Sequence, residues 1–133
     1  MPVYVFLREP DRLHQSLGVV GIEMSDVLIA YLLPWLEQIE RNTGKRIDLY
    51  NGVFFQDAEL ALLQEQIGES LNRLQREDAI VKVSLGVQTD PDGSQKELVR
   101  DLATSEAREA LQKVMQLLSQ AESENKAVLF SGD

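Results

Sequence analysis

The sequence predicts an α+β fold in which about three helices pack on a small, mostly antiparallel sheet. Three long segments carry apolar residues at helical spacing, and four short segments are rich in β-branched or alternating apolar residues. Their order is strand, helix, helix, strand, strand, helix, strand, which differs from the regular strand–helix alternation of a parallel sheet. With 133 residues, of which 44% are hydrophobic and 26% charged, the chain fits one globular domain over residues 1–133.

The first expected strand is VYVFL, residues 3–7, which Pro10 closes. A turn or short helix is expected over residues 11–16, followed by a glycine-marked stretch over residues 18–21. A basic start, an apolar core and a small-residue cleavage site do not occur together here. The segment is therefore interpreted as a strand and not as a leader peptide.

The first expected helix begins after Ser25, a suitable N-cap residue, and stops at Gly44. Its apolar residues cover all of its sides, which is typical of a helix that is buried on most faces. We therefore interpret it as a core helix. The alternative is that Tyr31 and Trp35 contact a partner, or a second copy in a homodimer. Pro34 is expected to kink this helix or to begin a second one, because proline has no amide hydrogen to donate.

The middle of the chain predicts a connector and a second helix. Residues 45–55 are interpreted as the connector, with a turn at Asn51-Gly52, and residues 57–77 as the helix. Asp57 is placed near the helix start, where a carboxylate accepts hydrogen bonds from unpaired backbone amides.

The last third of the chain predicts a hairpin, a helix and a strand. Residues 80–88 alternate like a half-buried strand, whose apolar face is expected to carry Val81, Val83, Leu85 and Val87. The turn-forming TDPDGSQ and the extended pattern of residues 96–102 complete the expected hairpin. Ser105 is expected to cap a third helix that ends near Glu124, and residues 127–130 form the last strand.

The charge balance limits the classes of partner. The chain has 22 acidic and 13 basic residues, a formal net charge of −9, which repels nucleic-acid phosphates and anionic membrane surfaces. The apolar run over residues 27–36 is also shorter than the roughly 20 residues that cross a bilayer. Neither nucleic acid nor membrane is therefore expected as a partner. A basic protein is favoured electrostatically, although acidic charge also serves solubility alone.

Candidate chemistry is sparse, so the protein is expected not to be an enzyme and to need no cofactor or metal. The absence of cysteine excludes thiolate metal sites and thiol nucleophiles, and indicates a cytoplasmic protein. His14 is the only histidine, so a Ser/His/Asp or Cys/His arrangement cannot draw on more than one imidazole, and we interpret His14 as a solvated or hydrogen-bonded surface residue. The stretch DPDGSQKELVRD starts like a calcium loop but has its glycine at the fourth position instead of the sixth. A small enzyme that uses carboxylates such as Glu65 and Glu69 is kept as the second alternative.

Two acidic sets are the candidate partner-binding residues. The first set lies on the second helix and consists of Glu59, Glu65 and Glu69. The second set lies on the hairpin and consists of Asp90, Asp92, Glu97 and Asp101. Each set can mimic phosphate charge toward a basic cleft, and each can equally be a solvated surface.

The run NTGKRIDLYNGVFFQDAELALL, the strand VKVSLGVQTD and the terminal VLFSGD together touch more than a third of the chain. On these segments the chain resembles small bacterial immunity proteins that are encoded beside polymorphic or contact-dependent toxins. The resemblance implies a cytoplasmic, non-enzymatic protein that binds one cognate toxin domain and neutralises it. Immunity proteins share no common functional residues, so the resemblance assigns none here. The alternative is an acidic secretion chaperone that binds an extended effector segment in apolar grooves.

Overall fold

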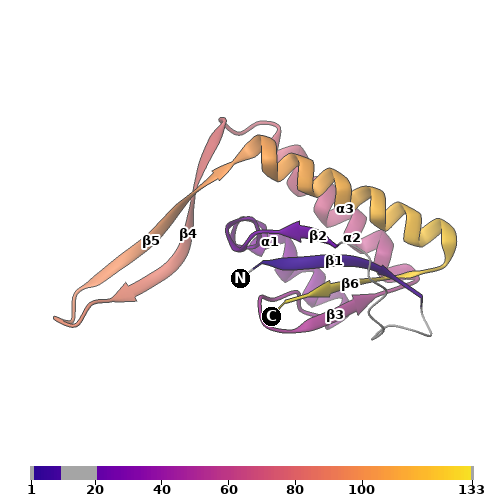
Figure 1. Cartoon of the computed structure of the whole chain (residues 1–133), viewed down its shortest axis with the longest axis horizontal. Helices are drawn as coiled ribbons and strands as arrows, with labels where there is room; N and C mark the ends of the chain where they lie inside the picture. Colours follow the sequence, from indigo (N-terminus) through magenta and orange to yellow (C-terminus); the bar gives the residue numbers. More distant parts are fainter. Residues whose placement is uncertain (1, 10–20, 133) are drawn as a thin grey trace.

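The computed structural model describes residues 2–9 and 21–132 and has an α+β fold with two antiparallel sheets (Figure 1). In chain order the elements are β1 (Val3–Arg8), β2 (Ile22–Met24), α1 (Asp26–Thr43), β3 (Gly52–Phe55), α2 (Ala58–Leu74), β4 (Ile80–Thr89), β5 (Gln95–Ala103), α3 (Thr104–Glu124) and β6 (Ala127–Ser131). The expected turn or helix at residues 11–16, the stretch 18–20 and His14 lie outside the described residues.

A four-stranded antiparallel sheet, in the order β2-β1-β6-β3, forms one layer of the molecule. Val5 and Val53 both lie opposite Phe130, and opposite residues share a face of a sheet. This face is buried against the helices, and on it the rings of Phe55 and Phe130 pack edge to face with centroids 5.6 Å apart. The apolar core therefore lies between this sheet and the three helices.

The helix α1 begins and ends as the sequence predicts. The Ser25 side chain accepts a hydrogen bond from the Leu28 amide, and Gly44 ends the helix with a φ of 72°, a conformation that favours glycine. One helix runs through Pro34, so the prediction of a second helix at this residue is wrong. Pro34 is exposed, and on the solvent side of a helix water can bond the carbonyl that proline leaves without a donor.

The starts of α2 and α3 differ from the predicted caps. Asp57 makes no side-chain cap hydrogen bond, and the carboxylate that reaches back is that of Glu59, which accepts from the Gln56 amide. At α3 the predicted cap Ser105 lies inside the helix. Both the amide and the hydroxyl of Thr104 donate hydrogen bonds to the Ala79 carbonyl. The helix α3 begins at Thr104, one residue before Ser105.

The strands β2 and β3 are absent from the sequence-based expectation. Each has only three or four residues, which is too short for alternation to be recognised. The expected connector contains β3, and Gly52 is the first residue of that strand. Both strands exist because they pair with β1 and β6, contacts that join segments far apart in the chain.

The strands β4 and β5 form a separate hairpin, the arm (residues 80–103), which extends away from the remaining structure, the body (Figure 1). Its cross-strand pairs run from Ile80 with Ala103 to Thr89 with Gln95. At its tip the Gly93 amide donates to the Asp90 carbonyl, and Gly93 has a φ of 88°. The predicted hairpin is therefore confirmed. Its projection from the body was not anticipated.

A β-bulge between Ser84 and Gly86 divides β4 into two parts. Val83 lies opposite Arg100 and Val87 lies opposite Glu97, two β5 residues that point to different faces because they are three positions apart. Val83 is buried, whereas Val87 is 64% exposed. The expectation of one apolar face from Val81 to Val87 is therefore wrong, because the extra residue of the bulge reverses the alternation.

Among the helices that the structure describes, none is both long enough and apolar enough to cross a membrane.

Candidate binding groove

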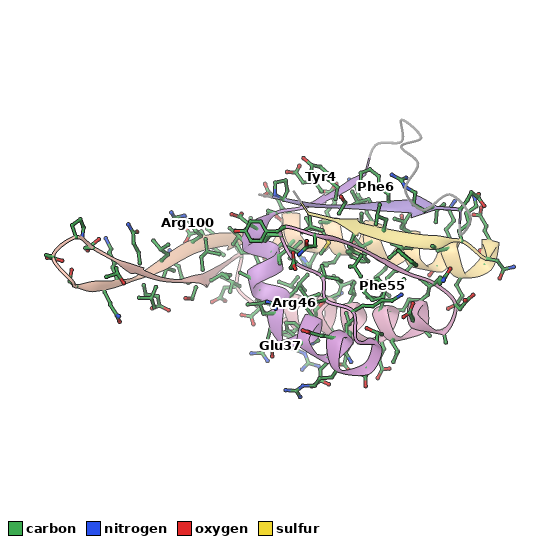
Figure 2. The ribbon with its side chains drawn as sticks, turned by 90° about the horizontal axis from the view of Figure 1, so that it is seen from below. Tyr4, Phe6, Glu37, Arg46, Phe55 and Arg100 are labelled. Carbon is green, nitrogen blue, oxygen red and sulfur yellow. The ribbon has the colours of Figure 1, made fainter. Side chains whose placement is uncertain are left out.

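An open groove of about 740 Å³ lies where the arm joins the body. Three segments line it: the first half of α1, residues 46–50, and β4 at its bulge. Figure 2 shows Arg46 at the end of the body from which the arm extends. The groove therefore lies at the junction of arm and body.

The groove has an apolar floor and exposed apolar rims. Ile29 and Ile47 are each 4% exposed and belong to the core, so the floor is rigidly packed. Leu33 is 46% exposed and Tyr50 is 68% exposed, and both also line the groove. Large apolar side chains in such a concave site can bury further surface only against a ligand or another protein.

The segment 46–50 is shaped by Asp48. Its Oδ1 accepts hydrogen bonds from the amides of Tyr50 at 2.7 Å and Asn51 at 2.9 Å, and its Oδ2 accepts from the Asn51 side-chain amide at 3.0 Å. The amide of Tyr50, followed by the Asn51 side chain, holds the pKa of the Asp48 carboxyl below its usual range. An ionised carboxylate therefore stands at the groove wall beside the Arg46 guanidinium.

The arm contributes the third wall through its bulge. Ser84, Leu85 and Gly86 all line the groove, and Leu85 is the residue without a cross-strand partner. Gly86 has a φ of 118°, which residues other than glycine rarely adopt. The irregular part of β4 therefore lies at the groove, and Leu85 is one of its lining residues.

The first acidic set is divided between two surroundings. Glu59 is partly buried and binds Lys45, whose Nζ lies 2.8 Å from Glu59 Oε1 and also donates to the Phe54 carbonyl at 2.8 Å. Glu65 and Glu69 lie one turn apart on the exposed side of α2. The structure therefore gives Glu59 a role inside the fold and leaves the other two in solvent.

The second acidic set is distributed along the arm. Asp92 accepts from the amide and hydroxyl of Ser94, contacts that hold the pKa of the Asp92 carboxyl low, and Asp90 accepts from the same hydroxyl. Asp101 pairs with Lys82, and Glu97 is exposed opposite Val87. These contacts explain the calcium-like spacing as a hairpin turn.

None of the seven predicted carboxylates lines the groove, and the structure does not bring the two sets together. The arm carries one set away from the body, while α2 holds the other within it (Figure 1). The groove is instead lined by Leu33, Arg46, Asp48 and Tyr50, none of which is among the residues predicted from sequence to bind a partner. The spacing of Asp48 from Asn51 is a signal for a side-chain-stabilised turn that could have been recognised.

Tyr31 and Trp35 contact each other, with ring centroids 5.6 Å apart, and both are partly buried against the core. Burial, followed by the Glu77 carboxylate, raises the pKa of the Tyr31 hydroxyl. A smaller fraction of each ring side chain is exposed than of Leu33 or Tyr50. The homodimer through Tyr31 and Trp35 stays a prediction.

Among residues 2–9 and 21–132 no group of three or more His, Cys, Asp or Glu side chains is arranged to hold a metal ion. Comparisons with protein-family models, with curated proteins and with solved structures give no match to this chain.

Proposed function

We propose that this protein binds another protein and that the groove between arm and body is the place where it does so. The observation that carries the proposal is the exposure of Leu33 and Tyr50 in a concave, mainly apolar site. Exposed apolar side chains rimmed by charged groups are typical of protein interaction surfaces. This role requires no catalytic residue or cofactor.

The occupant that fits is an apolar side chain from an exposed loop or strand of the partner. Leu33 from α1 and Leu85 from β4 both line the groove, together with the buried Ile29. Asp48 favours a basic residue beside that side chain, because its carboxylate is already ionised and oriented by the Tyr50 amide.

The partner that we propose is a toxin domain of basic character, whose activity is blocked when the protein binds. The sequence resemblance to immunity proteins supports this choice, and a formal net charge of −9 would accelerate encounter with a basic domain. In this scheme Glu65, Glu69, Asp90, Asp92, Glu97 and Asp101 attract the partner, and the groove retains it.

The second candidate is a secretion chaperone that holds an extended effector segment. It is favoured by the open form of the groove and by the exposure of Leu33, since chaperones of this kind bind client segments through apolar surfaces. The two candidates share the groove and differ in whether the partner is toxic on its own.

The test is co-expression of this protein with the product of the adjacent gene, with host growth and complex formation as readouts. We expect restored growth and a stoichiometric complex, both lost with Leu33→Asp. The matched control is Ala61→Asp, which places the same charge at an exposed position of α2 outside the groove. Circular dichroism verifies that both variants fold.

The outcomes separate the candidates. If the product of the adjacent gene is harmless but still binds, and Leu33→Asp abolishes the complex, the result supports the chaperone. A complex that survives Leu33→Asp removes the groove from the binding surface and contradicts the proposal.

A further inference from the structure

The arm offers a second candidate surface, the free edge of β4, part of which (Ser84, Leu85 and Gly86) also lines the groove. Its two strands have 10 and 9 residues, and among the described residues no third strand pairs with either. Beyond the bulge the arm projects past the body (Figure 1), and most of its residues there are exposed. A two-stranded hairpin that packs on nothing is only marginally stable in water, so a surface of this length is expected to have a partner.

The two edges of the arm differ in charge. The strand β5 carries Lys96, Glu97, Arg100 and Asp101, whereas Lys82 is the one charged residue of β4. Charged side chains protect an edge strand from pairing with another chain. The segment from Val83 to Thr89 lacks this protection and presents an uncharged backbone edge.

An exposed apolar side chain accompanies this edge. Val87 lies in the middle of the uncharged segment and is 64% exposed. Because β-branched residues stabilise cross-strand pairs, Val87 is suited to face an equivalent residue on an added strand.

The distribution of charge favours a second copy of this chain as the partner of the β4 edge. Residues 80–103 include three basic and four acidic residues, so the arm contributes −1 to the formal charge of −9 and the rest of the chain −8. Two copies that meet through their bodies repel each other strongly. Two copies that meet through their arms bring together nearly neutral surfaces.

We propose that two copies associate by antiparallel pairing of β4 with β4 about a two-fold axis at Val87, which joins two hairpins into one four-stranded sheet. In this register Val87 faces its equivalent and Gly86 faces Gln88, so like charges do not meet. Pairing of β5 with β5 about Val99 would instead set Glu97 against Asp101. The dimer is proposed from the edge of β4 and does not rest on the proposed groove function, although Gly86 belongs to both surfaces.

Cysteine cross-linking tests the register, because the natural chain has no cysteine. In Val87→Cys the two Cα atoms would lie about 4.5–5.5 Å apart, within reach of a disulfide. The matched control is Val99→Cys, another exposed valine but on β5, which the pairing keeps at least ~14 Å from its equivalent. We expect rapid cross-linking of the first variant alone under mild oxidation. Cross-linking of Val99→Cys alone, or of neither, overturns the proposal.

Sedimentation equilibrium of the natural chain tests the association itself. We expect a concentration-dependent mass that approaches twice the 15.0 kDa of one chain. Val87→Lys should raise the dimer dissociation constant at least about tenfold, since it sets two like charges face to face, whereas Val99→Lys should change it by less than about twofold. A monomer at all concentrations, or equal effects of the two lysines, contradicts pairing through β4.

Discussion

Glu59 and Glu65 lie on the same helix, but their carboxylates have different surroundings. Glu59 accepts hydrogen bonds from Lys45 and from the Gln56 amide, so it joins the segment after α1 to the start of α2. Glu65 is exposed to solvent. In the sequence the two residues look alike, because the position of Lys45 relative to α2 depends on the fold.

Glu59→Ala should lower the free energy of unfolding by about 1–2 kcal/mol, because it removes a helix-start hydrogen bond and a partly buried ion pair. Urea denaturation followed by circular dichroism measures the change. Glu65→Ala is the matched control, for which we expect a change within about 0.5 kcal/mol. Equal values for the two variants would show that the Glu59 contacts contribute no stability.

At the scale of elements, the bulge in β4 has the largest structural effect. It separates a proximal part that packs near α1 from a distal part that projects, and it places Leu85 in the groove. The position depends on Gly86, whose φ of 118° is strained for other residues.

Gly86→Ala should therefore destabilise the arm, at a cost of about 1–2 kcal/mol. Hydrogen exchange should accelerate in residues 80–103 with little change in the body. Gly68→Ala is the opposite control: Gly68 lies inside α2, where an added Cβ would meet only Met115 Cε at 3.8 Å. It should stabilise the protein by about 0.5–1 kcal/mol. Destabilisation by both alanines would count against strain as the cause.

The sequence predicted those elements whose determinants are local. The helix α1 carries its own start and stop signals in Ser25 and Gly44, and the arm carries its own turn around Gly93. The strand β3 and the bulge depend on partners elsewhere in the chain, which a single sequence does not reveal. The groove was missed for the same reason, because Leu33, Tyr50 and Leu85 come from three separate segments.

At the scale of the whole molecule, charge and shape are divided between body and arm. The body carries most of the negative charge, while the arm is almost neutral. Long-range attraction of a basic partner is therefore a property of the body, and close contact depends on the groove at the junction.

The double variant Glu65→Lys, Glu69→Lys should slow association with the proposed toxin partner at low salt by about 2–10-fold, with little effect on dissociation. Stopped-flow measurements across a salt series would show this difference. At about 1 M salt the variant and the natural chain should associate at equal rates, because screening then acts over only ~3 Å. An unchanged rate at low salt would exclude these residues from partner encounter.

The strand order of the main sheet also bears on how the protein folds during synthesis. The strand β6 lies between β1 and β3, although it follows every other element in the chain. Until residues 127–131 leave the ribosome, β1 and β3 have no shared neighbour, and the apolar faces of all three helices lack the completed sheet. The main sheet of the nascent chain can therefore be completed only after this segment is made, so the sheet-facing core residues are expected to become fully buried late in synthesis.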